Sequence, residues 1–330
     1  MTIPTTRRAV IAKKPGGPDV LSIENQKIPA LAADEILLRV RAFGLSRPDV
    51  LQRLGKYALP PNSDPVLGLE VAGDVVARGS AVTMGIGTSV CALCNGGGYT
   101  DYAIVKAGLT LPAPRGLTAI QAAAIPEAAF TVWYNLFDIG ALGRRERVLI
   151  HGGTSGVGSF AIQMARAQDA IVFATAGDER KVEACKKFGA HTAINYAKQD
   201  FAEIIRRETN GEGIEIIMDM VGGDYFAKNI DCLAMDGRLI EIAYLRGAKV
   251  ELNIDTVMSK RIMITGSKLR PLPMERKARV VAHAHKTLWG WIEGGKVKPV
   301  IDKVFPFTDI RTAHAYLESG QHIGKVVVEI

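Results

Sequence analysis

The chain has 330 residues, of which 48% are hydrophobic and 23% charged, so it is long enough for two globular domains with hydrophobic cores. The formal net charge is +7, but the lysines and arginines are dispersed, which predicts a solvated, mildly anion-attracting surface and not a nucleic-acid groove. No apolar run approaches the roughly 20 residues of a membrane helix, and the N-terminal segment lacks a signal-peptide core, so we expect a cytoplasmic protein.

The first third of the chain predicts short β-strands. Apolar segments at 35–45, 66–79 and 88–94 are separated by turns that contain glycine and proline, as in a β-barrel or sandwich. From Pro112 the sequence becomes rich in alanine and typical of helices, and Pro126 must begin or break a helix there.

Cys91 and Cys94 form a C-x-x-C pair at the end of the third β segment. A zinc site would need further Cys or His nearby, but the next cysteine is Cys185 and no histidine precedes His151. A redox dithiol of the thioredoxin type would open a helix, whereas this pair ends a β segment. We therefore predict two small, buried or half-buried side chains without a metal.

From Arg147 onward the pattern alternates between short β-branched runs and helices, which predicts a doubly wound parallel sheet covered on both faces. Ligands bind such sheets at the carboxyl ends of the strands. The predicted strands are 147–150, 170–176, 191–196, 214–221, 237–243 and 261–267. The tail is expected to return to the first domain, so the predicted organisation is 1–125, 126–269 and 270–330.

A glycine-rich turn, Gly152–Gly158, joins the first of these strands to a helix. The glycines allow a tight turn and close backbone approach, and the helix N-terminus offers N–H groups to a phosphate. Ser155 replaces the middle glycine of G-x-G-x-x-G, yet the order of strand, turn and helix predicts a dinucleotide site. One alternative is a tight turn without a ligand; the hydrolase motif G-x-S-x-G fails because position 157 is Val.

The end of the second strand of this domain favours NADPH over NADH. An acidic residue there would bind the ribose 2′-hydroxyl, but Ala176 and Gly177 occupy the place. Arg180 and Lys181 follow within one helical turn, and a small residue with a nearby cation suits a 2′-phosphate. The acids at 178–179 argue for the opposite preference, and Lys181 has a second interpretation as a solvated helix residue.

Several segments together resemble the medium-chain dehydrogenase/reductase superfamily, and within it the zinc-free quinone oxidoreductases of the zeta-crystallin-like and p53-inducible types. The resemblance implies a GroES-like β-barrel domain, a Rossmann domain and a nicotinamide bound between them, hence an α/β fold. The segments that carry it span nearly the whole chain and include LGLEVAGDV, NGGGYTDYAIV, LPAPRGLTAIQAAAIPEA, LIHGGTSGVGSFAIQMA and HIGKVVVEI.

Zinc-dependent members of this superfamily have a G-H-E motif where this chain has Gly68-Leu69-Glu70, and a catalytic Cys where it has Ser46. Leu69 has no lone pair and a serine hydroxyl is a poor zinc ligand. The resemblance therefore implies a reductase that works without a metal and disfavours alcohol dehydrogenation.

The resemblance also assigns roles to single positions. Tyr57 and Ser46 would lie in the substrate cleft, where either could donate a hydrogen bond to a developing oxyanion. Ser46 departs from the Asn that is usual in this group, and by spacing alone Tyr57 would be a packed aromatic. The implied cofactor-binding residues are Thr131, Thr154, Ser155, Gly156, Val157, Gly177, Lys181, Tyr196, Ala243, Tyr244, Ser267, Lys268, Leu269 and His322.

The expected activity is hydride transfer from NADPH to a quinone or related conjugated carbonyl. An NADPH-dependent reductase of enone or enal double bonds is the alternative. A third class, a non-catalytic protein that binds NADPH or RNA, lacks an aromatic and basic stacking platform in the sequence. We expect a small-molecule substrate, no membrane partner, and a homodimer or homotetramer joined through the strands at 237–243 and 261–267.

Overall fold

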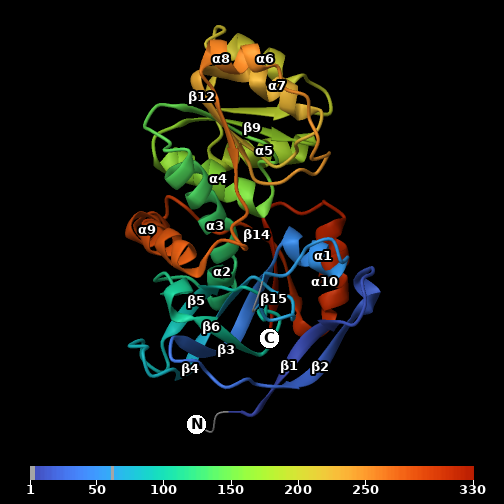
Figure 1. Cartoon of the computed structure of the whole chain (residues 1–330), viewed down its shortest axis with the longest axis vertical. Coiled ribbons are helices and arrows are strands. Elements are labelled where there is room, and N and C mark those ends of the chain that lie inside the picture. The colour runs from blue at the N-terminus through green and yellow to red at the C-terminus, as the bar shows by residue number, and fades with distance from the viewer. Residues whose placement is uncertain (1–3, 61–62) are drawn as a thin grey trace. The chain divides into compact units, whose positions relative to one another are not determined.

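The computed structural model describes residues 4–60 and 63–330, which form two compact units (Figure 1). The first unit comprises residues 1–130, 270–293 and 299–330, and the second comprises 131–269 and 294–298. The domain boundaries expected from the sequence, at 125/126 and 269/270, stay predictions.

The first unit is built around a seven-stranded sheet in the order β14-β15-β3-β4-β5-β7, with β6 paired to β3. Its alternating apolar residues form one core in which Phe43 stacks on Tyr99 at 4.4 Å between ring centroids. A separate antiparallel pair, β1 and β2, lies beside it. The strands are β1 (Thr6–Ala12), β2 (Leu21–Lys27), β3 (Glu35–Leu45), β4 (Glu70–Arg78), β5 (Ser89–Leu93), β6 (Tyr102–Lys106), β7 (Thr110–Pro112), β14 (Ile301–Pro306) and β15 (Lys325–Glu329).

The helices of the first unit begin where sequence signals predict. Ser46 precedes α1, and Thr118 accepts a hydrogen bond from the Gln121 N–H at the start of α2. Pro126 begins α3, where its missing N–H has no cost. The helices are α1 (Arg47–Arg53), α2 (Ala119–Ala123), α3 (Pro126–Val132, which continues into the second unit), α9 (Met274–Glu293) and α10 (Ile310–Glu318).

The second unit contains a six-stranded parallel sheet in the order β10-β9-β8-β11-β12-β13, so the doubly wound prediction is confirmed. All six predicted runs form strands, although β12 begins four residues earlier than its run. The strands are β8 (Arg147–Ile150), β9 (Ile171–Ala176), β10 (Thr192–Asn195), β11 (Ile214–Asp219), β12 (Leu233–Glu241) and β13 (Met263–Gly266). The helices are α4 (Gly156–Ala167), α5 (Glu179–Phe188), α6 (Phe201–Glu208), α7 (Tyr225–Cys232) and α8 (Ile254–Lys260), preceded by a π-helix over Trp133–Ile139.

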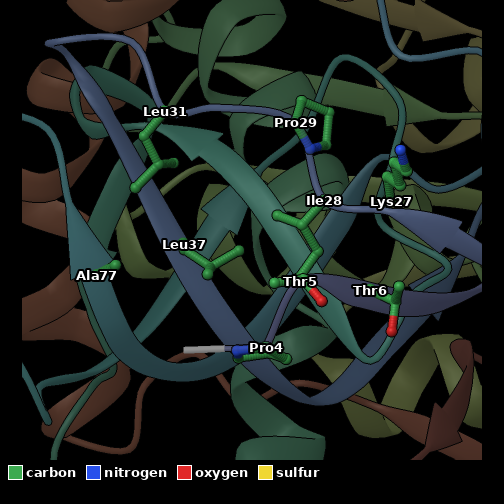
Figure 2. A pocket seen from close by; sticks show the side chains of 9 residues that line it. All are labelled: Pro4, Thr5, Thr6, Lys27, Ile28, Pro29, Leu31, Leu37 and Ala77. Atoms are coloured by element: carbon green, nitrogen blue, oxygen red, sulfur yellow. The ribbon is translucent and has the colours of Figure 1, made fainter. Parts of the chain in front are cut away.

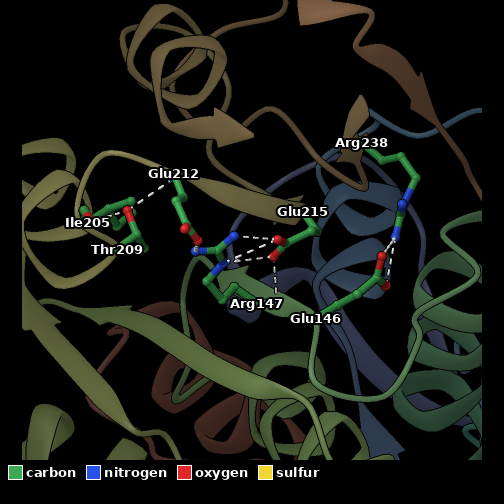
Figure 3. A network of polar contacts seen from close by, with 8 residues as sticks. Glu146, Arg147, Ile205, Thr209, Glu212, Glu215 and Arg238 are labelled. Atoms are coloured by element: carbon green, nitrogen blue, oxygen red, sulfur yellow. Dashed lines mark hydrogen bonds and ion pairs between the residues drawn. The ribbon is translucent and has the colours of Figure 1, made fainter. Parts of the chain in front are cut away.

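Ion pairs hold the amino ends of the central strands together (Figure 3). Arg147 donates to Glu215 from its side chain at 2.5 Å and from its backbone N–H at 2.7 Å, and also reaches Glu212 at 2.7 Å. Arg238 contacts both carboxylate oxygens of Glu146. These pairs lie at the edge of the sheet where β8, β11 and β13 begin, and a ligand of such a sheet binds at the opposite, carboxyl edge.

Candidate functional site

The glycine-rich turn lies between β8 and α4 at the carboxyl edge of the parallel sheet. Gly152 has φ +66°, a left-handed conformation that favours glycine, and a side chain at Gly158 would overlap the Gly152 carbonyl. The Ser155 hydroxyl accepts the Gly158 N–H at 2.9 Å and so caps α4. The first N–H groups of a helix have no partner inside it, so this cradle fits a phosphate.

A series of hydrogen bonds between buried polar side chains lies next to this turn. His151 Nε2 lies 2.8 Å from Asn229 Oδ1, and Asn229 donates to Asp219 Oδ2 at 3.0 Å. The other ring nitrogen lies 3.0 Å from the Thr175 hydroxyl, which also receives the Gly152 N–H at 3.4 Å. Burial lowers the pKa of His151, so the ring is neutral, with its proton assigned to Nε2 by these contacts.

Sequence reasoning did not single out His151, Thr175, Asn229 or Asp219 as supports of the turn. The sequence does contain one signal for such a support, a histidine placed between a buried strand and the first glycine of the motif. These four residues are buried; His151 directly follows β8, and the other three belong to β9, α7 and β11. They therefore fix the ends of three neighbouring strands relative to the turn.

Gly177, at the end of β9, lies beside Tyr196. A methyl group placed on Gly177 would come within 2.7 Å of the Tyr196 hydroxyl, so glycine keeps the space next to that hydroxyl open. Asp178 caps α5 by accepting the Lys181 N–H at 2.8 Å. Glu179 accepts from Asn195 and from Lys198. Both neighbouring acids thus have structural partners, which weakens the argument that they select a ribose hydroxyl.

Five of the predicted nicotinamide-side residues follow the carboxyl ends of β12 and β13, namely Ala243, Tyr244, Ser267, Lys268 and Leu269. Asn135 donates to the Thr131 carbonyl at 2.8 Å and accepts from the Ser267 hydroxyl at 2.9 Å, so it brings those two predicted residues together. Lys268 Nζ lies 5.6 Å from the centre of the Tyr244 ring. Ala243 adjoins Tyr244, Leu269 is buried, and His322 lies in the first unit between α10 and β15.

In the first unit, Ser46 belongs to a buried network with charged partners. Its hydroxyl accepts from Lys325 Nζ at 2.9 Å and donates to Glu127 at 3.2 Å. Lys325 also pairs with Glu70 at 2.5 Å, and the second Glu70 oxygen accepts the Glu127 N–H at 2.9 Å. Burial raises the pKa of Glu70 to about 7. Sequence reasoning named Ser46 but missed Glu127 and Lys325, which lie far away in the sequence.

Tyr57, the other predicted substrate residue, follows α1 and is half-buried. The guanidinium of Arg270 lies 5.4 Å from the centre of its ring, a cation–π contact. The structure therefore places an arginine against the residue that was predicted to line the substrate site.

The C-x-x-C pair lies at β5, and the prediction that both side chains are buried is confirmed. Burial raises the pKa of Cys91 to about 12, and that of Cys94 is raised as well, so both remain thiols near neutral pH. Within residues 4–60 and 63–330, no group of three or more His, Cys, Asp and Glu side chains is arranged to hold a metal ion. No helix in the same residues is long and apolar enough to span a membrane.

One pocket of about 590 Å³ lies in the first unit near the start of β1 and the end of β2 (Figure 2). Its wall is mostly apolar and includes Pro4, Ile28 and Leu37, with Lys27 at one side. No predicted site residue lines it, so it gives no support to the expected chemistry.

Two sequence families match the chain. Residues 32–115 match the family described as "Alcohol dehydrogenase GroES-like domain", which confirms the predicted class of the first domain, and residues 188–328 match "Zinc-binding dehydrogenase". The chain is also similar to segments of polyketide synthases. It is 31% identical over 299 residues to a mycocerosic acid synthase-like polyketide synthase of Mycobacterium tuberculosis, of which it spans 14%.

Full-length similarity extends to smaller proteins. The chain is 30% identical to a 2-haloacrylate reductase of Burkholderia sp, covering 97% of this chain and 98% of that protein. It is 29% identical to a quinone oxidoreductase of Rattus norvegicus, covering 97% of each. Among solved structures, Escherichia coli quinone oxidoreductase complexed with NADPH superposes with a TM-score of 0.87 at 28% identity, covering 98% of this chain and all of that one.

Proposed function

The chain belongs to the medium-chain dehydrogenase/reductase superfamily of oxidoreductases, and from that premise we propose that it is an NADPH-dependent quinone oxidoreductase that acts without a metal. The observation that carries the proposal is the glycine-rich turn at the N-terminus of α4, set in a fold that matches an NADPH-bound quinone oxidoreductase over its whole length. A related conjugated carbonyl would be reduced in the same way.

NADPH, when bound, supplies a hydride ion. The turn at Thr154, Ser155, Gly156 and Val157 would hold the pyrophosphate, and the Lys181 side chain would balance the charge of a 2′-phosphate in the space beside Gly177 and Tyr196. The proposed contacts on the nicotinamide side are Thr131, Ala243, Tyr244, Ser267, Lys268, Leu269 and His322.

The chain's own residues would orient the substrate and stabilise the charge that develops on its oxygen. A quinone is already a strong electrophile, so positioning and hydrogen bonding suffice. Tyr57 is our first candidate donor. Ser46 is the second, and its hydroxyl would have to leave Glu127 to act, because it carries a single hydrogen that Glu127 accepts in the structure.

The test is NADPH oxidation followed at 340 nm with 1,4-benzoquinone, with wild type and Tyr57→Phe compared. We expect quinone-dependent oxidation by the wild type and a lower kcat in the variant, with unchanged NADPH binding. Tight NADPH binding without quinone turnover would contradict the proposal. Stoichiometric zinc in the purified active enzyme would contradict its metal-free part.

Reduction of a conjugated carbon–carbon double bond is the second candidate. The observation that favours it is the 30% identity with a 2-haloacrylate reductase, whose name describes a conjugated acid as substrate. Product analysis separates the two, since a quinone gives a hydroquinone whereas an acrylate gives a saturated acid.

We also propose that two copies join through the edge strand β13. Edge strands expose unpaired backbone groups, and here large apolar side chains lie exposed close to that edge in the sequence, among them Met258 and Met263. Light scattering after gel filtration should give a dimer or a tetramer; a monomer at micromolar concentration would contradict this arrangement.

A further inference from the structure

Two cationic side chains, Arg270 and Lys277, are buried together in the first unit. Arg270 is 6% exposed and Lys277 2% exposed. Neither forms an ion pair with a carboxylate among the residues that the structure describes. Burial, together with the charge of Arg270, lowers the pKa of Lys277 to about 8. Burying charge without a counter-ion is unfavourable, so this pair calls for an explanation beyond packing.

Polar contacts hold the guanidinium in one orientation. Arg270 donates from its two terminal nitrogens to Gln52 Oε1 at 2.8 Å and to the Asn95 carbonyl at 3.1 Å. Lys277 Nζ donates to Asn95 Oδ1 at 2.5 Å and to the Arg270 carbonyl at 2.9 Å, so Asn95 contacts both cations. A donor fixed in this way loses little entropy when it binds a partner.

One nitrogen of this arginine makes no hydrogen bond to the described part of the chain. Arg270 Nε is buried and has no hydrogen-bond partner within residues 4–60 and 63–330. Buried N–H groups in proteins are nearly always satisfied by protein, water or a ligand. Asp49 and Glu127 attract the guanidinium only from beyond ion-pair distance, and Asp49 already accepts from Tyr99, Ser46 and Gly68.

The unsatisfied donor lies beside the proposed substrate residue, because the same guanidinium packs on the Tyr57 ring. A carboxylate suits this donor, since its charge is opposite to that of the guanidinium and a charge-assisted N–H···O bond is roughly twice as strong as a neutral one. We propose that Arg270 is a specificity residue that binds the carboxylate of a conjugated acid substrate, with Lys277 adding to the positive potential. The inference rests on the proposed reductase function and narrows its substrate class.

The first test measures binding, which does not depend on turnover. The NADP⁺-saturated enzyme is titrated calorimetrically with 2-chloropropionate, a saturated acid, and with its neutral methyl ester. We expect the wild type to bind the acid more tightly than the ester. Arg270→Gln should weaken acid binding about 10- to 100-fold, the range for hydrogen bonds to charged groups, and leave ester binding unchanged. Arg270→Lys, which keeps the charge but loses the Nε donor, should bind the acid with an affinity between those of the wild type and Arg270→Gln.

Arg279→Gln is the matched control, because Arg279 lies exposed on the same helix as Lys277 and its loss changes the net charge equally. This control should keep the wild-type ratio of acid to ester affinity. If Arg270→Gln fails to fold, Arg270→Lys decides the question, with its melting temperature as the check. An unchanged ratio in a folded Arg270 variant, or a wild type without preference for the acid, overturns the proposal.

The second test compares 2-chloroacrylate with its methyl ester as substrates and 1,4-benzoquinone as a neutral reference. We expect Arg270→Gln to raise KM for the acid about 10- to 100-fold and to leave KM for benzoquinone within a factor of a few. If the enzyme reduces benzoquinone but its KM for 2-chloroacrylate is the same with and without Arg270, this inference is refuted and the reductase proposal stands. If binding of the acid depends on Arg270 but no substrate is turned over, the reductase proposal is refuted and the carboxylate site at Arg270 stands.

Discussion

Replacement of Lys325 by methionine tests the buried network of the first unit. The lysine Nζ lies 2.5 Å from Glu70, 2.8 Å from the Leu45 carbonyl and 2.9 Å from the Ser46 hydroxyl. Methionine fills similar space but removes the charge, so Glu70, which is fully buried, keeps only the Glu127 N–H. Removal of one partner from a buried ion pair typically costs about 3–5 kcal/mol.

The size of this loss should depend on pH. The pKa of Glu70 is about 7 because burial raises it more than Lys325 lowers it, so removing Lys325 raises it further. A carboxyl group whose pKa is higher in the folded state makes the free energy of unfolding fall as pH rises above its unfolded pKa, until the folded pKa is reached. The wild-type contribution therefore levels off near pH 7, whereas the variant continues to lose about 1.4 kcal/mol per pH unit.

Urea unfolding at pH 7 and pH 9, followed by circular dichroism, measures this difference. Lys325→Met should lose up to about 3 kcal/mol more than the wild type between the two pH values, at about 1.4 kcal/mol per unit. The double variant Lys325→Met/Glu70→Gln is the control, because an uncharged amide needs no cation and does not titrate. An equal loss at both pH values, or a double variant no more stable than Lys325→Met at pH 9, would refute the reasoning.

Three further predictions follow from other parts of the structure. Lys181→Met should weaken NADPH binding about tenfold and leave NADH binding unchanged in a fluorescence titration, since charge-assisted bonds to the extra phosphate are lost; equal loss for both contradicts it. Arg147→Met should destabilise the protein by about 1–2 kcal/mol at pH 7. Burial raises the pKa of Glu215, but hydrogen bonds from Arg147 lower it more, so the net shift is downward. The stabilisation by this pair is therefore present above about pH 4.5 and is lost as pH falls through the lowered pKa. A difference in denaturant midpoint between wild type and variant that does not change with pH would disprove this. Ellman's reagent at pH 8 should react slowly with the four buried thiols, those of Cys91 and Cys94 included, and quickly after unfolding; fast labelling of Cys91 or Cys94 in the native protein, located by peptide mapping, would contradict their burial.

The second unit was predictable because its signals are local. Each strand is a short run of β-branched residues, and the turn at Gly152–Gly158 identifies itself by the strand before it and the helix after it. A glycine in the left-handed region and a serine that caps a helix require only neighbouring residues. The start of β12 was missed because Leu233 pairs with Ile214 of β11 before a register shift, and the pairing resumes only at Arg238, which a periodicity does not reveal.

The charged residues of the first unit were not predictable in the same way. Lys325 and Ser46 are separated by 279 positions, and Asn95 and Lys277 by 182. A lysine at the start of a strand or on a helix is expected to be exposed, because burial of its charge is costly. Only the fold shows that Lys277 and Lys325 are buried with fixed oxygen partners, so neither entered the predicted site.

These contacts also bear on the metal-free part of the proposed function. Ser46 and Leu69 stand where the superfamily resemblance places two zinc ligands, Leu69 offers no lone pair, and Glu70 follows it in the Gly-Leu-Glu motif. The Ser46 hydroxyl is held between Lys325 and Glu127, and each Glu70 oxygen has a partner in Lys325 or in the Glu127 N–H. The ammonium of Lys325 thus supplies at this place the positive charge that balances Glu70. A metal ion would have to displace that ammonium, so the lysine and the lost ligands act in the same direction.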